Sequence, residues 1–231
     1  MKLLVLDVEG TLFKTKIRLP GTNLDSTIWQ SLALALGPEA VKEEIETHDK
    51  WKNNEYCSYL DWMKETIAIH CKYKLNRDLF KKIIASAEYN EGALEVISKI
   101  DRSKYELVMV SGGFRELTIR AQKDLNIIHS FAACEYIFDD AGALRSYNLL
   151  PCDFRGKIDF INLLIREYNI APADWIFIGD GANDVPIAET APVSIGINPH
   201  RELARVVTWK INSFSELPDI LEMYKDKCLR D

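Results

Sequence analysis

Acidic side chains follow two apolar segments of this chain, each at the point where the apolar segment ends. Asp7 and Glu9 follow the first segment, and Asp180 and Asp184 follow a later one. Alternation in an extended chain places Asp7 and Glu9 on the same side. Gathering three or four carboxylates is electrostatically costly unless a cation neutralises them. An oxygen-only ligand set favours Mg²⁺, so these four residues are the candidate metal ligands.

A second kind of motif is suited to binding an anion. Ser111 and Gly112 follow another apolar segment, where a hydroxyl and backbone N–H groups at the start of a helix favour phosphate. Ser-Gly-Gly turns also occur without any ligand. Lys157 lies 180 − 157 = 23 residues before Asp180, and taken alone it is typical of a solvated helix surface.

The elements that must position these residues are predicted by continuous apolar runs. The runs are Leu3–Leu6, Leu107–Val110, Trp175–Ile178 and Val193–Ile197. Continuous apolarity is typical of parallel strands that are buried on both faces. Apolar spacing predicts helices over 114–125 and 157–168, which serve as right-handed crossovers. The fold class is therefore α/β, with a Rossmann-like parallel sheet flanked by helices, and the motifs lie at the carboxyl ends of its strands.

The C-terminal half contains three further predicted elements. Cys134–Tyr147 is predicted to form a hairpin with a Gly-containing turn, and Val206–Ile211 a further strand. A last helix is expected near 215–224, with Ser215 as its N-cap and Pro218 in its first turn.

The segment from 14 to 88 is different in kind. It contains helical patterns and no convincing strand, which predicts an all-helical insertion after the first strand. The patterns cover Ser26–Leu36, Pro38–Lys52, Ser58–His70 and Arg77–Ala87. The many aromatic residues fit either a helix-bundle core or a substrate-facing wall, and we expect a core. The expected domains are 1–13 with 89–231 as the core domain and 14–88 as the insertion.

Composition and charge limit the classes of partner. The 231 residues include 29 basic and 35 acidic side chains, a net charge of −6, which argues against general binding to nucleic acid. The first apolar run is too short for a signal peptide, and no stretch approaches the ~18 apolar residues of a membrane span. The five scattered cysteines form no CxxC pair, so reduced thiols are expected. These features predict a cytoplasmic protein, monomeric or homodimeric, without a membrane partner.

The chain thus has four motifs, which contain Asp7 and Glu9, Ser111 and Gly112, Lys157, and Asp180 and Asp184. In this order and context they resemble the haloacid dehalogenase (HAD)-like hydrolase superfamily, specifically its phosphoserine phosphatase-like branch. The most specific strings are Val-Ser-Gly-Gly-Phe at 110–114 and Gly-Asp-Gly-Ala-Asn-Asp at 179–184. The resemblance implies that the segment 14–88 is a helical cap domain. It also implies a magnesium-dependent phosphatase, in which Asp7 is the nucleophile that forms an aspartyl-phosphate.

The resemblance also assigns roles to the other motif residues. Glu9 stands where the family has an aspartate that protonates the leaving group and ligates magnesium through its backbone carbonyl. Asp180 is implied as a direct metal ligand, with Asp184 as a second acidic contributor. The remaining implied roles concern the phosphoryl group, which is held by Ser111 and the Gly112 N–H, oriented by Asn183 and neutralised by Lys157.

Two departures from the family pattern bear on function. Glu9 is one methylene longer than the usual aspartate, although a glutamate here also resembles the catalytic enolase-phosphatase branch. The cap lacks the arginine expected to grip the phosphoserine carboxylate, since no arginine lies between Trp51 and Tyr73. By a rough register, Ser26 takes the place of the cap glutamate.

We therefore expect a Mg²⁺-dependent phosphatase that acts on a small phosphorylated metabolite. Phosphoserine phosphatase proper and a phosphotransferase are open alternatives within that class. The rivals outside it are a non-catalytic protein that retains the fold and, less favoured, a dehalogenase, for which the acidic metal site is not needed.

Overall fold

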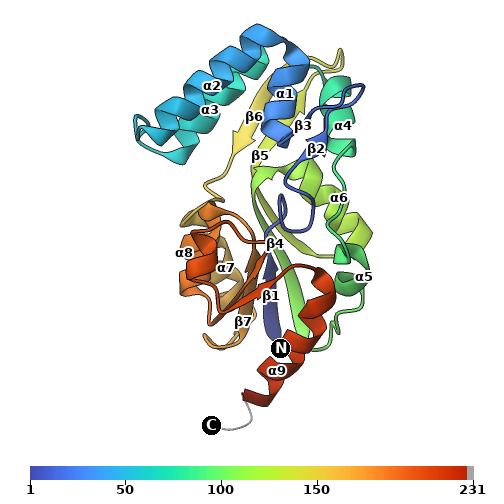
Figure 1. Cartoon of the computed structure of the whole chain (residues 1–231), viewed down its shortest axis with the longest axis vertical. Coiled ribbons are helices and arrows are strands. Elements are labelled where there is room, and N and C mark those ends of the chain that lie inside the picture. Colours follow the sequence, from blue (N-terminus) through green and yellow to red (C-terminus); the bar gives the residue numbers. More distant parts are fainter. Residues whose placement is uncertain (228–231) are drawn as a thin grey trace. The chain divides into compact units, whose positions relative to one another are not determined.

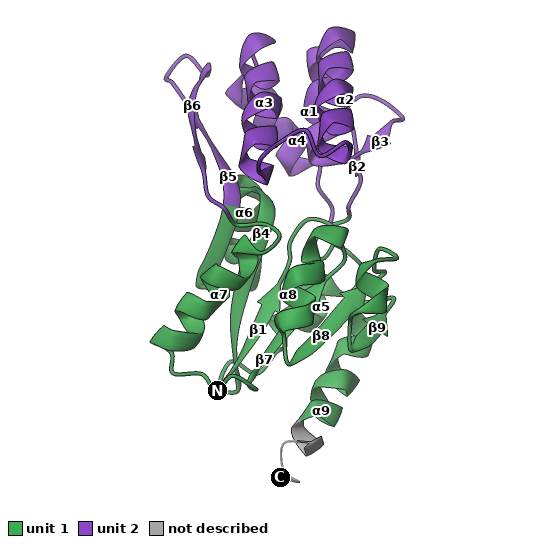
Figure 2. Cartoon of the chain, turned by 90° about the vertical axis from the view of Figure 1, so that its left-hand side faces the viewer, with its two compact units in different colours: residues 1–14, 89–132, 152–231 green, residues 15–88, 133–151 purple. Residues whose placement is uncertain are grey.

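The protein is described here from a computed structural model that covers residues 1–227. Its chain forms two compact units (Figure 2). The core unit consists of residues 1–14, 89–132 and 152–231, and the inserted unit of Thr15–Glu88 and Ala133–Pro151.

A seven-stranded sheet carries the predicted motifs. Its strands, in the order in which they lie across the sheet, are β6 (Leu144–Leu149), β5 (His129–Phe138), β4 (Tyr105–Phe114), β1 (Lys2–Leu6), β7 (Trp175–Gly179), β8 (Val193–Ile197) and β9 (Trp209–Ile211). Strands β4, β1, β7, β8 and β9 pair in parallel, whereas β5 and β6 are antiparallel. The predicted α/β class with a Rossmann-like sheet is confirmed.

Helices cover both faces of the central strands. The helices of the core unit are α5 (Ala93–Ser98), α6 (Arg115–Leu125), α7 (Gly156–Glu167), α8 (Val185–Thr190) and α9 (Leu217–Lys227). Figure 1 shows α7 and α8 on one side of β1 and β4, and α5 and α6 on the other. Because both faces are covered, every residue of β7 and β8 is buried, which explains their continuous apolarity.

The start of the last helix differs from the prediction. The chain first forms a 3₁₀ turn, Phe214–Glu216, and α9 begins only at Leu217. The extended residue before this turn is Ser213, whose Oγ accepts the backbone N–H of Ser215 at 3.3 Å. The N-cap predicted at Ser215 is therefore wrong, because the extra turn moves the cap two residues earlier.

The inserted unit contains all four predicted helices. They are α1 (Ile28–Leu36), α2 (Pro38–Lys52), α3 (Tyr59–Lys72) and α4 (Arg77–Ala85). Side chains of Thr27, Ser58 and Asn76 cap the first, third and fourth of them. The unit is not all-helical, however, because β2 (Ile17–Arg18) and β3 (Asp25–Ser26) pair antiparallel before α1.

The hairpin formed by β5 and β6 belongs mainly to the inserted unit, and so the units differ from the expected boundaries of 14–88 and 89–231. Its residues 133–151 group with the helices rather than with the core. The reason is packing, since Tyr136 and Phe138 place their rings 5.2 and 5.6 Å from that of Phe80 in α4. The Arg77 N–H also donates to the Gly142 carbonyl at 2.9 Å.

A buried polar pair joins this hairpin to α3. The Tyr136 hydroxyl lies 2.6 Å from His70 Nδ1, and burial lowers the pKa of His70 to about 4, so the imidazole is neutral. We expect Tyr136→Phe to lower the free energy of unfolding by about 1–3 kcal/mol, because a buried ring nitrogen loses its partner. Urea denaturation measures this. The matched control is Tyr147→Phe, an exposed tyrosine of the same hairpin, for which the change should stay within about 0.5 kcal/mol. Equal effects of the two substitutions would contradict the assignment.

The cysteines at 57, 71, 134 and 152 are free thiols, the last two of them buried. Cys228, which we also expect to be reduced, lies outside the described residues.

Candidate active site

Asp7 directly follows β1, a central strand of the sheet. The four residues before it, Leu3 to Leu6, have no exposed surface, and Asp7 itself is 4% exposed. Its backbone N–H donates to the Ile178 carbonyl of β7 at 2.9 Å. The parallel pairing of β1 and β7 therefore brings Asp7 beside the residues that follow Ile178.

Lys157 is the ion-pair partner of Asp7. It lies in the first turn of α7, has no exposed surface, and donates to Asp7 Oδ1 at 2.7 Å and Asp184 Oδ1 at 2.6 Å. This arrangement differs from the solvated helix surface that a lone lysine suggests, because α7 starts against the carboxyl ends of β1 and β7. A buried ammonium is stable there only while carboxylates surround it.

The chain after β7 folds into a tight acidic turn. Asp184 has no exposed surface, and its Oδ2 accepts the backbone N–H groups of Asp180 and Gly181 at 3.1 and 3.0 Å. Asp180 Oδ1 accepts the Thr11 hydroxyl at 3.0 Å, which links this turn to the loop after β1. Carboxylate oxygens of Asp7, Asp180 and Asp184 all lie within 4.8 Å of one another.

Burial shifts the titration of these groups. It raises the pKa of Asp7 well above its usual value, against the lowering effect of Lys157. Burial, together with the nearby Asp184, also raises the pKa of Asp180 to about 7. Burial alone would lower the pKa of Lys157, but Asp184 and Asp7 hold it well above the usual value. Lys157 is thus charged, but its single positive charge does not balance the negative charge of the surrounding carboxylates.

The acidic cluster fits a divalent cation. When ionised, Asp7, Asp180 and Asp184 carry more negative charge than Lys157 alone balances, and a divalent cation would offset this excess. The three converging groups are carboxylates, which are hard oxygen donors. The buried acidic triad can therefore hold a metal ion.

The Ser-Gly-Gly segment is extended and forms the end of β4, beside Glu9. The Ser111 hydroxyl accepts the Gly113 N–H at 3.1 Å and is 1% exposed. A Cβ added to Gly113 would lie 3.0 Å from Glu9 Oε2 and 3.5 Å from Ser111 Oγ. The carboxylate of Glu9 and the hydroxyl of Ser111 therefore lie on the same side of Gly113, in a space that glycine leaves open.

Asp153 is part of the site and was missed from the sequence. Its Oδ1 accepts the Asn183 amide at 2.8 Å and lies 3.7 Å from Lys157 Nζ. A Cβ on Gly112 would come within 2.4 Å of its carboxylate. It stands four residues before Lys157, so an i, i+4 pairing with a functional lysine was the one available clue. Through Asp153, the structure joins Asn183 and Gly112 to Lys157, and thus all eight predicted site residues lie in the core unit around the ends of β1, β4 and β7.

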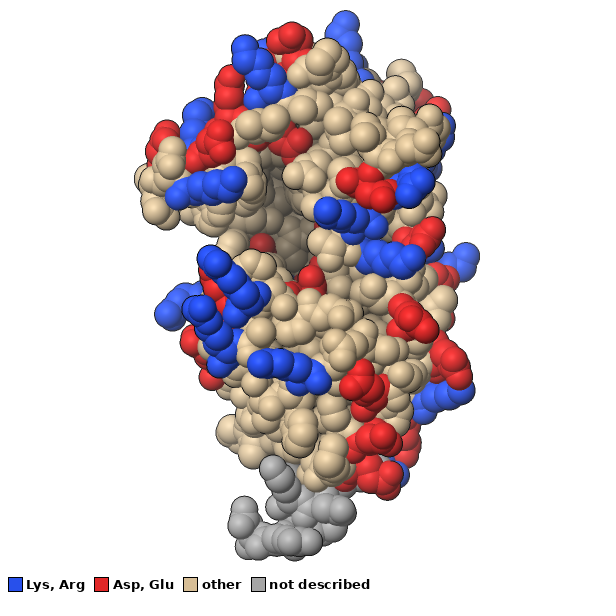
Figure 3. All heavy atoms as spheres, in the orientation of Figure 1, with Lys and Arg blue, Asp and Glu red and all other residues tan. Residues whose placement is uncertain are grey.

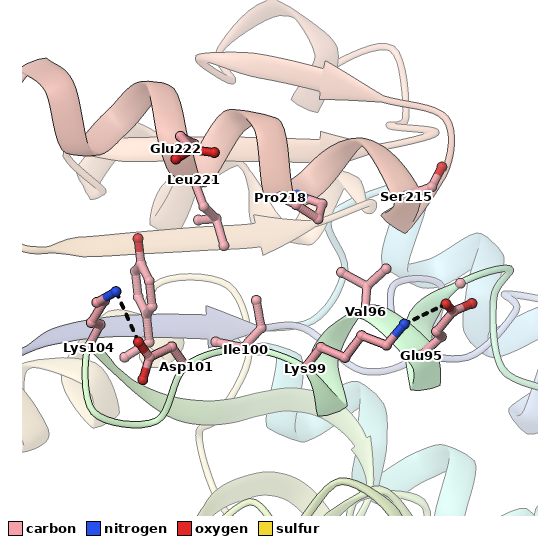
Figure 4. A pocket seen from close by; sticks show the side chains of 12 residues that line it. Glu95, Val96, Lys99, Ile100, Asp101, Lys104, Ser215, Pro218, Leu221 and Glu222 are labelled. Atoms are coloured by element: carbon pink, nitrogen blue, oxygen red, sulfur yellow. Dashed lines mark hydrogen bonds and ion pairs between the residues drawn. The ribbon is translucent and has the colours of Figure 1, made fainter.

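A pocket lies at the other end of β4 from Ser111 and differs in kind from the acidic cluster (Figure 4). Its volume is about 560 Å³, and it lies between α5 and α9 beside Tyr105, the first residue of β4. Lys99 forms an ion pair with Glu95, four residues before it, and Lys104 with Asp101, three residues before it. The charged groups of this pocket are therefore paired locally, and they do not gather around one buried residue as the carboxylates gather around Lys157.

Comparison with known proteins assigns the chain to a family. The family model of the haloacid dehalogenase-like hydrolases matches residues 1–191. The chain belongs to this family, as the motifs predicted.

Individual relatives agree with the predicted branch. The chain is 26% identical to phosphoserine phosphatase of Lactococcus lactis, over 91% of this chain and 89% of that protein. It is 25% identical to that of Archaeoglobus fulgidus, over 58% of this chain but only 39% of the relative's length. A solved phospho-aspartyl intermediate analogue of phosphoserine phosphatase has the same fold, with a TM-score of 0.74, 20% identity, and coverage of 96% of this chain and 98% of that one. The predicted phosphoserine phosphatase-like branch is confirmed.

Proposed function

We propose that this hydrolase is a Mg²⁺-dependent phosphatase that hydrolyses a small-molecule phosphomonoester through an aspartyl-phosphate on Asp7. The observation that carries the proposal is the buried ion pair of Asp7 with Lys157. A carboxylate oxygen of Asp7 also lies within 4.8 Å of carboxylate oxygens of Asp180 and Asp184. Relatives named phosphoserine phosphatase support the reaction class.

In the first step, Asp7 attacks phosphorus with the oxygen that does not face Lys157. The new bond joins Asp7 Oδ2 to phosphorus, and the bond between phosphorus and the ester oxygen breaks. Glu9 gives its proton to the departing alkoxide, which leaves as an alcohol. In the second step, Glu9 takes a proton from water as the water oxygen attacks phosphorus. The bond between Asp7 Oδ2 and phosphorus breaks, which leaves the free Asp7 carboxylate and inorganic phosphate.

The remaining residues stabilise charge and fix the position of the phosphoryl group. Ser111 and the Gly112 N–H donate to its oxygens, Lys157 lies against the nucleophile, and Asn183 orients the group. Asp7, Asp180 and Asp184, with the Glu9 carbonyl, would hold Mg²⁺. The bound ion supplies positive charge that neutralises the phosphoryl oxygens.

The first test is release of inorganic phosphate from a generic aryl phosphate. Turnover should require Mg²⁺, stop on addition of EDTA, return with excess Mg²⁺, and be absent from Asp7→Asn. Metal-independent turnover, or equal rates for the two proteins, would refute the proposal.

The substrate is proposed only as a small phosphorylated metabolite. Ser26, which takes the place of a cap glutamate, is buried and shares a 2.6 Å hydrogen bond with Ser31. Lys64 and Lys72 form ion pairs with Asp61 and Glu43 of the same unit. Comparing kcat/KM over a panel of phosphometabolites that includes phosphoserine separates phosphoserine phosphatase from other phosphatases. Adding an alcohol as acceptor, and measuring whether it becomes phosphorylated, separates hydrolysis from phosphotransfer.

Surface charge and hydropathy bear on the other expected partners. Basic and acidic side chains both occur on each unit in the face shown in Figure 3. Within residues 1–227, no helix has the length and apolarity needed to cross a bilayer. The cytoplasmic location, the absence of a nucleic-acid partner and the monomeric or homodimeric state stay predictions.

The position of Asp153 gives a further prediction. Its carboxylate lies against Gly112, whose N–H is proposed to bind phosphate. In Asp153→Asn the amide oxygen can still accept the Asn183 hydrogen bond, but one negative charge is gone. We expect inorganic phosphate to inhibit this variant more strongly, by about 1 kcal/mol or roughly fivefold in the inhibition constant. Inhibition by phosphate that is unchanged or weaker would contradict the expectation.

A further inference from the structure

Asn90 makes an unusual set of contacts with the loop that follows β1. Its side-chain Nδ2 donates to the carbonyls of Gly10, Thr11 and Phe13 at 2.8, 2.7 and 3.2 Å. Its backbone N–H donates to the Leu12 carbonyl at 2.8 Å. One residue thus contacts the carbonyls of four consecutive loop residues, 10 to 13.

This loop forms one wall of the acidic cluster. The Thr11 hydroxyl donates to Asp180 Oδ1 at 3.0 Å. Gly10 has φ +92°, and a Cβ there would lie 2.2 Å from Asp180 Oδ2. The Asp180 carboxylate thus occupies the space that a side chain at position 10 would need, and a shift of the loop would move the Thr11 hydroxyl relative to Asp180. Glu9 immediately precedes the loop and would move with it.

The loop closes on itself but needs an outside support. The Gly10 N–H donates to the Phe13 carbonyl and the Phe13 N–H to the Val8 carbonyl, at 2.8 and 2.9 Å. The ring of Phe13 stacks on that of Tyr89 at 4.1 Å, which holds the end of the loop against the neighbour of Asn90. The stacked rings of Phe13 and Tyr89 fix the position of the end of the loop. The hydrogen bonds of the Asn90 amide fix the direction in which the loop carbonyls point.

We infer that Asn90 is a positioning residue that sets the loop 10–13 and, through Thr11 and Gly10, the placement of Asp180 for metal binding and phosphoryl transfer. The inference rests on the proposed function and adds to it a residue outside the four motifs. The chemistry requires an amide, because the three acceptors of the side chain are carbonyl oxygens and only a donor satisfies them. An aspartate of the same shape would direct a carboxylate at those oxygens.

The test compares Asn90→Asp and the milder Asn90→Ala with a matched pair at Gln122. The Gln122 amide also donates to two backbone carbonyls of the core unit, those of Ile127 and Ile128 at 3.2 and 3.0 Å. Gln122→Glu and Gln122→Ala therefore repeat the same chemical changes away from the acidic cluster. The readouts are Mg²⁺ affinity by calorimetry, kcat and KM for an aryl phosphate, and thermal denaturation.

We expect both Asn90 variants to bind Mg²⁺ at least about tenfold more weakly and to lose at least about tenfold in kcat, with the aspartate worse than the alanine. KM should change by less than about threefold, because the phosphate-binding turn at Ser111 is untouched. The Gln122 variants should keep both values within about twofold of the wild type, whatever their loss of thermal stability. Asn90 variants that only melt earlier, with Mg²⁺ affinity and kcat of the folded protein preserved, would overturn the inference.

The calorimetric arm separates this inference from the proposed function. A wild type that binds Mg²⁺ but releases no phosphate would refute the phosphatase proposal, and the Asn90 effect on Mg²⁺ affinity would still decide the positioning role. A wild type that binds no Mg²⁺ would overturn the positioning role itself.

Discussion

Asp7→Asn is expected to abolish turnover, with a loss of kcat of at least about 10³-fold. The carboxamide keeps the shape of the side chain but cannot form the acyl phosphate. Because Lys157 retains its 2.6 Å contact with Asp184, the variant should stay folded. Phosphate release measured beside circular dichroism and thermal denaturation separates lost chemistry from lost structure.

The intermediate gives an independent check on the same residue. Acid quenching during turnover should leave one phosphoryl group on wild-type protein, removable by hydroxylamine as an acyl phosphate is, and mass spectrometry should place it on Asp7. The control is Asp174→Asn, an exchange of the same type at the half-exposed aspartate that precedes β7. It should leave kcat within about twofold of the wild type. A folded Asp7→Asn protein with a substantial fraction of wild-type activity would rule out Asp7 as the nucleophile.

The parallel strands could be predicted from the sequence because their burial leaves a simple pattern. β8 matches its predicted bounds, and β1 and β7 differ by a single residue, since each is buried along almost its whole length and consists mainly of apolar residues. β4 is longer than predicted, because extended backbone continues through Ser111 and the two glycines to Phe114. Polar and small residues interrupt the apolar pattern there without interrupting the strand.

The parts that could not be predicted depend on contacts between distant segments. The hairpin of β5 and β6 groups with the helical insertion because Tyr136 contacts Phe80 and His70, which sequence periodicity cannot show. Asp153 and Asn90 lie in irregular segments, and they make hydrogen bonds to partners that are 30 and 80 residues away. The acidic motif residues were found because they follow apolar strands, and the other motif residues through recognisable short motifs. Asp153 and Asn90 support the motif residues from outside these patterns.

Lys157→Met is expected to reduce stability as well as activity. The substitution roughly preserves the length of the side chain but leaves the carboxylates of Asp7 and Asp184, and nearby Asp153, without their buried counter-charge. Removing one partner of a buried ion pair costs about 3–5 kcal/mol. Urea denaturation in EDTA should show a loss of this size, whereas Lys99→Met, which breaks an exposed pair with Glu95, should change stability by less than about 1 kcal/mol.

Mg²⁺ makes the Lys157 result specific to the proposed site. A cation bound by Asp7, Asp180 and Asp184 supplies part of the positive charge that the methionine variant lacks. We therefore expect excess Mg²⁺ to restore more stability to Lys157→Met than it adds to the wild type, since the stabilisation by a ligand of the folded state rises with the logarithm of its affinity. Activity should stay low even then, because neutralisation of the phosphoryl group beside Asp7 is lost. Equal stabilisation of both proteins by Mg²⁺ would mean that the lysine and the metal do not share the same carboxylates, and the metal would then have to be placed elsewhere.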